Sequence, residues 1–338
     1  MNETAPVRET HALHQDATTD RFERAFRLYR RRVGRCRTEN QSNRLHIALD
    51  NYMTPAEVRY FAAALAQDAA DSFGRRWITT LVGSMPIKKV RSVEFERTEL
   101  RKGVSLYSTN DGSRNHKTLV IGIAGLHHRL MAPTSYILDC LNPALYDVII
   151  LRDFSGRAFA FGIPGLGGDF FEALSGLRAL VDPRAYRNAL SLGTSSGGLP
   201  AVMAAILLGL NRGISICGED LGWFAARVKS QGGDDARYLT LLASRPQPYP
   251  ELVLVCGEKK MDDAAAAVVL HNLVPSELWK VRNCAQHGIF KWYMSRGTLP
   301  AFLAKILGQS LESRDLASVR LTTARTSIAG SGSRERLL

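Results

Sequence analysis

The segment Gly193–Gly197 contains the residue types of a nucleophile turn. Its sequence, Gly-Thr-Ser-Ser-Gly, matches the pattern G-x-S-x-G with Ser195 at the centre. An alternating apolar run precedes it and a long apolar helical run follows it, so the pattern predicts a strand, a tight turn and a helix. Such a turn exposes a hydroxyl in strained backbone geometry, and the flanking glycines keep neighbouring side chains away. We therefore interpret Ser195 as a candidate nucleophile.

The helix expected after this turn would supply part of the chemistry. Its first amides and the positive end of its dipole point to the place where negative charge develops on an attacked carbonyl oxygen. The N–H of Ser196 is then one donor of an oxyanion hole. A glycine-rich strand-to-helix connection without catalytic function is the alternative, because the five-residue pattern is short.

Strand-like and helix-like segments alternate around this turn from about residue 91 onward. The first two strand segments alternate apolar and polar residues, as an antiparallel pair does. The third, KTLVIGIAG, is a continuous apolar run typical of a strand covered on both faces. Alternation then continues to about residue 310, interrupted by a polar insert over 221–250. This order predicts an α/β fold with a mostly parallel, doubly wound sheet and antiparallel first strands.

Residues 91–310 resemble the α/β-hydrolase fold, because two antiparallel strands lead into a parallel series with G-x-S-x-G after the fifth strand. The resemblance implies a serine hydrolase in which an acid and then a histidine follow the serine along the chain. It also implies that the insert over 221–250 is a lid that shapes the substrate pocket.

The resemblance places the acid in the turn after the strand ELVLVCGE. The family often has aspartate three residues past the glycine of this turn, but that position is Lys260 here, so the sequence departs from the family pattern. Asp262 and Asp263 follow, and we expect one to cap the next helix while the other orients the histidine. We favour Asp262 as the acid, with Asp263 as the alternative and Glu258 as a third candidate.

The resemblance places the base in the loop after the last strand, where this chain has His287. A neutral imidazole there could accept the Ser195 proton on one nitrogen while the carboxylate holds the other. The segment GLHH at 125–128 takes the place of the family's oxyanion loop, so the N–H of Leu126 is the expected second donor.

The sequence does not predict a metal or organic cofactor. The adjacent residues His127 and His128 point in different directions on a loop and lack a metal-site spacing. The glycine-rich segment 161–168 does not match the dinucleotide pattern G-x-G-x-x-G. The five cysteines are widely spaced, with no C-x-x-C pair, and indicate thiols in a reducing compartment.

Composition bounds the possible location and partners. The chain has 338 residues, of which 45% are hydrophobic, and a formal net charge of +12. Its apolar runs are far shorter than the roughly 20 residues of a membrane span, and its first residues lack the core of a secretory signal, so we expect a cytoplasmic protein. The positive charge is spread along the chain. We interpret the arginine cluster over 27–37 as a solvated helix face and expect no nucleic-acid partner.

Three segments lie outside the resemblance. Residues 1–18 and 311–338 are expected to be disordered, and 19–85 to form a small helical module. Within the module, the sequence Thr-Pro-Ala-Glu at 54–57 predicts a helix start with a cap, a proline in the first turn and an early carboxylate. The module shows no chemistry, so we expect it to serve a protein partner or self-association.

The sequence thus predicts a hydrolase that cleaves an ester, thioester or amide through an acyl-enzyme. The segments SLGTSSGG and HHRLMAP are also similar to segments of hydrolase-like proteins encoded with bacterial surface-polysaccharide genes, so a small-molecule or glycan acyl ester is the expected substrate. Two alternatives stay open. One is an acyltransferase with the same triad, and the other is a non-catalytic binding protein on this fold.

Overall fold

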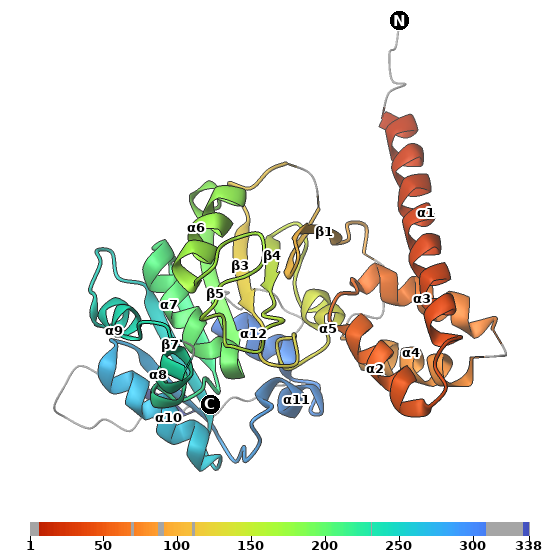
Figure 1. Cartoon of the computed structure of the whole chain (residues 1–338). Helices are drawn as coiled ribbons and strands as arrows, with labels where there is room; N and C mark the ends of the chain where they lie inside the picture. The colour runs from red at the N-terminus through yellow and green to blue at the C-terminus, as the bar shows by residue number, and fades with distance from the viewer. Residues whose placement is uncertain are drawn as a thin grey trace, which may run out of the picture. The chain divides into compact units, whose positions relative to one another are not determined.

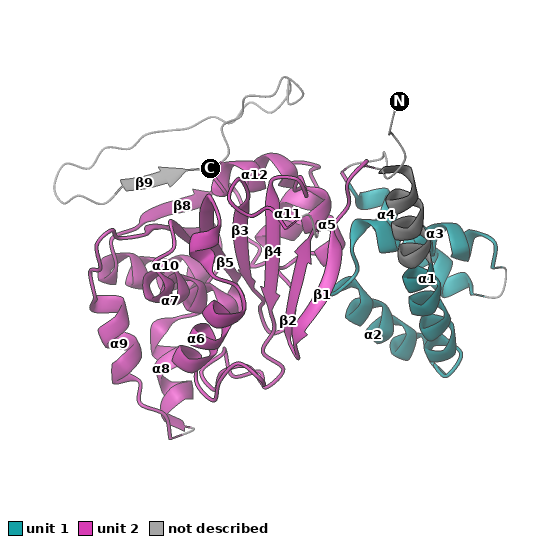
Figure 2. Ribbon diagram, turned by 90° about the horizontal axis from the view of Figure 1, so that it is seen from above, with its two compact units in different colours: residues 1–85 teal, residues 86–338 magenta. Residues whose placement is uncertain are grey.

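The computed structural model describes residues 7–68, 71–86, 91–109, 112–230, 232–308 and 334–337. The chain divides into two compact units, residues 1–85 and 86–338, shown in teal and magenta in Figure 2. None of the described helices is both long enough and apolar enough to span a bilayer. Of the two segments expected to be disordered, residues 1–6 and most of 311–338 lie outside the described residues, so for them disorder stays a prediction. The described parts form the start of a helix from Val7 and a short strand over Arg334–Leu337.

The first unit is helical, as predicted. Its helices are α1 (Val7–Val33), α2 (Glu39–Asp50), α3 (Pro55–Ala66) and α4 (Ser72–Ser84). The predicted start of α3 is confirmed, because the amide of Glu57 donates to Thr54 Oγ1 at 3.2 Å and the amide of Thr54 donates to Glu57 Oε2 at 2.7 Å. Its core includes Tyr29, Val58, Phe61, Leu65, Ile78 and Leu81.

The second unit contains one twisted sheet, visible in Figure 1. Its strand order is β1-β2-β4-β3-β5-β6-β7-β8-β9. Strand β2 runs antiparallel to both of its neighbours, and all pairs from β4 onward are parallel. The bounds are β1 (Glu96–Arg101), β2 (Val104–Ser108), β3 (Thr118–Ile123), β4 (Tyr146–Leu151), β5 (Asn188–Thr194), β6 (Arg212–Ile216), β7 (Glu251–Gly257), β8 (Glu277–Val281) and β9 (Arg334–Leu337).

Helices cover both faces of this sheet (Figure 2). One buried cluster lies under α6 (Phe170–Leu180), α7 (Gly198–Leu208), α8 (Leu221–Ser230), α9 (Ala236–Ala243) and α10 (Met261–Leu273). The other lies under α5 (Thr134–Asp139), α11 (Ile289–Met294) and α12 (Leu299–Ile306). The central strands are buried along almost their whole length, as their continuous apolar sequences require. The predicted doubly wound α/β fold with antiparallel first strands is therefore confirmed.

The insert over 221–250 contains α8 and α9. Phe224 and Val228 of α8 and Tyr238 and Leu242 of α9 are buried in the first cluster, so the inner faces of both helices belong to the core. Its polar composition comes from the outer faces. The role of this segment as a lid stays a prediction.

Candidate active site

The serine turn has the strained geometry that a strand-to-helix elbow requires. Strand β5 ends at Thr194, and the short 3-10 helix η2 (Ser195–Gly197) leads directly into α7. Ser195 has a φ of +54°, which is unusual for a residue with a side chain. A Cβ atom at Gly193 would lie 1.9 Å from the carbonyl oxygen of Gly197, so this close crossing needs glycine. The half-buried Ser195 side chain is thereby set at the carboxyl end of a central strand.

Two amides flank Ser195 where an oxyanion would form. Ser196 lies in the first helical turn, where an N–H has no acceptor within the helix. Leu126 lies in the turn after β3, and Gly125 of this turn is so close to Ser195 that an added Cβ would lie 3.2 Å from the serine Cβ. Within the described residues the amides of Gly125 and His128 bond inside the turn, while the Leu126 amide has no acceptor. Ser196 follows Ser195 directly and the turn of Leu126 lies close to it, and the role of both amides as oxyanion donors stays a prediction.

The imidazole of His287 pairs with Asp263. His287 Nδ1 lies 3.0 Å from both carboxylate oxygens of Asp263, whose side chain is 11% exposed. Asp262, in contrast, is 89% exposed and forms an ion pair with Lys260 at 2.8 Å. The preference for Asp262 does not match this geometry, and the alternative Asp263 takes its place.

The reason for this correction is the phase of helix α10. Successive helical residues point about 100° apart, so only one of two neighbouring aspartates can face the sheet edge. The expectation that the other aspartate caps the helix is also wrong, because α10 has no side-chain cap and Asp262 binds Lys260 instead. The third candidate, Glu258, accepts the amide of Asn283 at 2.7 Å and thereby holds the turn after β8.

The His287 ring is available on its other side. Its Nδ1 lies against Asp263, and the side chain is 42% exposed. His287 belongs to the loop that precedes α11. The described part of the chain has no hydrogen bond between Ser195 and His287. Catalytic hydrogen bonds often form only when substrate is bound.

The side chain of Cys217 lies near Asp263 and His287. The sequence did not predict this neighbour. Cys217 follows β6 with a φ of +47° and is 1% exposed. Burial, followed by the charge of Asp263, raises the pKa of this thiol well above its ordinary range. Ligand atoms of Cys217, Asp263 and His287 lie within 4.8 Å of one another, and all three are zinc-ligand types.

Glu219 is a second group that sequence reasoning missed. Burial raises the pKa of its carboxyl to about 7, against the lowering effects of Arg227 and His287. Its Oε2 is buried and has no hydrogen-bond partner in the described part of the chain. A carboxyl group that titrates near neutral pH beside a candidate base is typical of functional sites.

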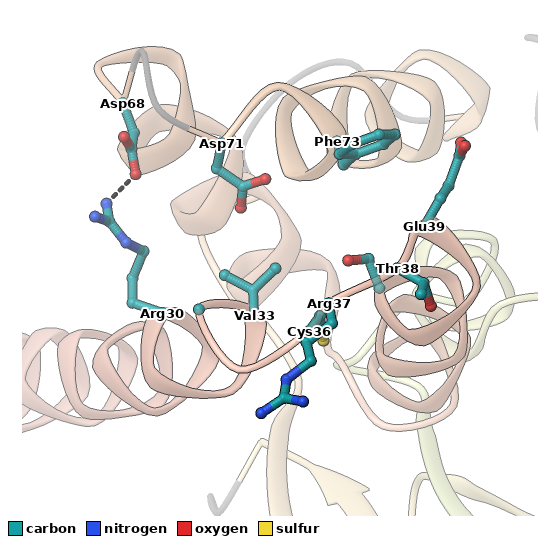
Figure 3. Close-up of a pocket in the computed structure, with 11 residues that line it drawn as sticks. Arg30, Val33, Cys36, Arg37, Thr38, Glu39, Asp68, Asp71 and Phe73 are labelled. Atoms are coloured by element: carbon teal, nitrogen blue, oxygen red, sulfur yellow. Dashed lines mark hydrogen bonds and ion pairs between the residues drawn. The ribbon is translucent and has the colours of Figure 1, made fainter.

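The first unit also contains a hollow, drawn in Figure 3. It has a volume of about 370 Å³, and charges of both signs line it. Arg30 forms an ion pair with Asp68. Asp71 caps α4 through the amide of Gly74 and accepts the hydroxyl of Tyr29. Because both aspartates have partners within the unit, we assign no chemistry to this hollow.

Comparisons with known proteins add similarity to solved structures only. No protein-family model and no curated protein sequence matches the chain. An esterase from Pyrobaculum calidifontis superposes with a TM-score of 0.45 at 14% identity, covering 78% of this chain and 97% of the esterase.

Two further structures are similar to the same extent. The α/β-hydrolase enzyme MGS-MChE2, from a sediment metagenome of the Mar Chica lagoon, has a TM-score of 0.42 at 16% identity and covers 63% of this chain and 96% of its own. The capsule O-acetyltransferase of Neisseria meningitidis serogroup A has a TM-score of 0.42 at 12% identity, with coverages of 65% and 96%. These are similarities of backbone fold only, and we draw no functional conclusion from them.

The fold follows from the topology of the chain itself. The order β1-β2-β4-β3-β5-β6-β7-β8, with β2 antiparallel and the remaining pairs parallel, places a strained serine turn after the fifth strand. This arrangement, together with an aspartate after β7 and a histidine after β8, is the α/β-hydrolase fold.

Proposed function

We propose that this protein is a serine hydrolase that cleaves an ester, thioester or amide. The observation that carries the proposal is the pairing of His287 Nδ1 with Asp263 at 3.0 Å, after the strands that end at the same sheet edge as the strained Ser195. A carboxylate that holds one ring nitrogen fixes the imidazole tautomer, and the other nitrogen can then serve as a base.

The proposed reaction proceeds in two stages. Ser195 Oγ attacks the carbonyl carbon while His287 Nε2 accepts its proton, and the amides of Ser196 and Leu126 bind the negative oxygen. The leaving group departs with the proton from His287, and the acyl group stays on Ser195. Water then attacks the acyl-enzyme with His287 again as the base, and this step releases the acid and restores the enzyme. Asp263 stays ionised and stabilises the imidazolium.

A fluorophosphonate probe tests this proposal directly. We expect the probe to label the native protein at Ser195, as located by mass spectrometry of peptides, and we expect Ser195→Ala to abolish both labelling and the hydrolysis of p-nitrophenyl esters. A panel of p-nitrophenyl esters with different acyl chain lengths then identifies the preferred acyl group. Repeating the assay with an added alcohol as acceptor distinguishes hydrolysis from acyl transfer. Equal labelling of native protein and Ser195→Ala would favour a non-catalytic protein.

We also propose a cytoplasmic location. All five cysteines are free thiols, and three of them are buried. Unpaired thiols persist in reducing compartments. Fractionation of cells that produce the protein at native level tests this location.

A further inference from the structure

A depression with a volume of about 440 Å³ lies between α8 and the loop after β4. Two arginines, Arg157 and Arg227, and the indole of Trp223 line it, together with Gly156, Ala226 and Ser230. None of these lining residues is acidic. In the hollow of the first unit Arg30 forms an ion pair with Asp68, whereas neither arginine of this depression forms an ion pair within the described residues. The charge of Arg227 does act on the nearby carboxyl of Glu219.

One ring contact and one electrostatic effect connect the depression with the candidate active site. On one side, the ring of Phe154, two residues before Gly156, packs on His128 with centroids 4.8 Å apart, and His128 belongs to the turn of the oxyanion donor Leu126. On the other side, the charges of Arg227 and His287 both act on Glu219. On this basis we expect a group bound in the depression to lie near a carbonyl held at Ser195.

The loop that carries Arg157 is held in one shape by Asp153. This carboxylate is 8% exposed and accepts the amides of Ser155 and Arg157 at 2.7 Å and of Phe159 at 3.0 Å. The next residues, Ala158 and Phe159, have φ values of +52° and +65°. Left-handed residues with side chains persist only where surrounding contacts hold them, and they concentrate at functional sites.

Arg227 connects α8 to this loop. Its guanidinium lies 3.8 Å from the centroid of the Trp223 ring, and its Nη1 donates to the carbonyl oxygen of Gly156. A guanidinium has five N–H donors, so this contact leaves donors for an anion. Trp223 is 36% exposed and offers a ring face next to these donors.

We propose that Arg157, Arg227 and Trp223 form a subsite that binds a carboxylate or phosphate carried by a ring-bearing part of the substrate. The proposal rests on the proposed function, because the subsite selects the ester presented to Ser195. The two guanidinium groups bind the anion, and the indole face stacks on the ring.

Binding of small probes tests the subsite without any reaction. The probes are 4-hydroxybenzoate, 4-hydroxyphenyl phosphate and the neutral 4-hydroxybenzamide, each titrated into the full chain by calorimetry. We expect at least one anionic probe to bind about tenfold more tightly than the amide, as one charge-assisted hydrogen bond provides. The better of the two anions identifies whether the site prefers carboxylate or phosphate. Equal binding of all three probes would overturn the proposal.

Single substitutions of the two arginines test whether the probes bind in the depression. Arg157→Gln removes an exposed guanidinium that has no hydrogen bond or ion pair in the described residues and lies 5.1 Å from the centroid of the Phe161 ring. Arg227→Gln also removes the hydrogen bond to Gly156 and the contact with the Trp223 ring. Each variant is expected to weaken anionic probes about tenfold and to leave 4-hydroxybenzamide unchanged. Arg178→Gln is the matched control, because Arg178 on α6 is also exposed, its guanidinium has no hydrogen bond or ion pair in the described residues, and it does not line the depression. If the control variant loses as much affinity for the anionic probes as Arg157→Gln does, the assignment of Arg157 to the subsite is contradicted.

The corresponding esters connect the subsite to catalysis. For 4-acetoxybenzoate against 4-acetoxybenzamide we expect Arg157→Gln to raise KM for the charged ester alone, with kcat nearly unchanged. Fluorophosphonate labelling of Ser195 reports separately on the proposed function. Normal labelling without anion preference would reject the subsite, and anion binding without labelling would reject the hydrolase.

Discussion

The two units contain similar sets of polar residues in different surroundings. In the helical unit, the hydroxyl of Tyr29 donates to Asp71 and lies 3.3 Å from His46 Nε2. His46 is 3% exposed, and its ring stacks on Trp77 with centroids 4.3 Å apart. This set connects α1, α2 and the start of α4, and its members are directed at one another.

The set in the sheet unit is open on one side. Asp263 holds one nitrogen of His287, but the ring is 42% exposed and its second nitrogen points away from the carboxylate. The neighbouring Ser195 is held in a strained conformation, whereas Tyr29 is in an ordinary helix. A carboxylate, an imidazole and a hydroxyl therefore do not define an active site by themselves. The difference is a histidine nitrogen that has no partner within the described residues, on a sheet whose central strand ends in the strained Ser195.

Substitution of the two histidines gives the largest contrast. We expect His287→Gln to lower kcat for ester hydrolysis by about 10³–10⁴-fold, because the base is lost. His46→Gln should leave kcat unchanged and lower the free energy of unfolding by about 1–3 kcal/mol, since a buried hydrogen-bonded group is replaced. Steady-state kinetics and urea unfolding of both variants measure the two effects. Loss of activity in a well-folded His46→Gln protein would contradict this division.

The two neighbouring aspartates give the next contrast. Asp263→Asn should lower kcat by about 10²–10⁴-fold, because the amide no longer fixes the proton position on His287. Asp262→Asn is the matched control at the next position of the same helix turn and should change kcat by less than about twofold, because exposed ion pairs contribute little. Similar losses in both variants would argue against Asp263 as the acid.

The pH dependence of stability should differ between the units, with the larger effect at Glu219. Because burial raises the pKa of this carboxyl from 4.5 to about 7, its contribution to stability is present below pH 4.5 and is lost as the pH rises to 7. Glu219→Gln should therefore raise Tm at pH 8 and leave it nearly unchanged at pH 4. Thermal unfolding at both pH values measures this difference, and a Tm gain at pH 4 alone would show that the sign is wrong.

His46 should give a smaller effect in the opposite direction. Burial lowers its pKa below the ordinary value of 6.5, although Asp71 acts against this lowering. The stability that depends on neutral His46 is therefore present above pH 6.5 and is lost as the pH falls through the lowered pKa. Native protein should lose more Tm between pH 7 and 5 than His46→Gln does. Equal losses would show that His46 does not titrate in this range.

The local features of the fold were predictable because they depend on short-range physics. The continuous apolar runs of β3 and β4 require burial on both faces, and the glycines at 193 and 197 allow the close crossing of strand and helix. The candidate nucleophile, the α/β class and the start of α3 at Pro55 therefore follow from the residues themselves.

Tertiary structure decided which side chains meet. Strand β4 lies between β2 and β3, and this order brings Arg157 near α8, 70 positions further along the chain at Arg227. The insert over 221–250 is a second example. Its polar composition did not predict that residues of α8 and α9 are buried in the core.

The choice between Asp262 and Asp263 shows this limit most clearly. The two residues have the same side chain at consecutive positions, so composition and spacing are nearly equal for both. Only the rotation of α10 against the sheet directs Asp263 to His287 and Cys217 and leaves Asp262 to Lys260. That rotation is set by packing of the same helix face on the core, because Ala267 and Leu270 follow Asp263 by four and seven positions and are buried. The sequence thus determined the serine turn, and the tertiary structure determined its partners.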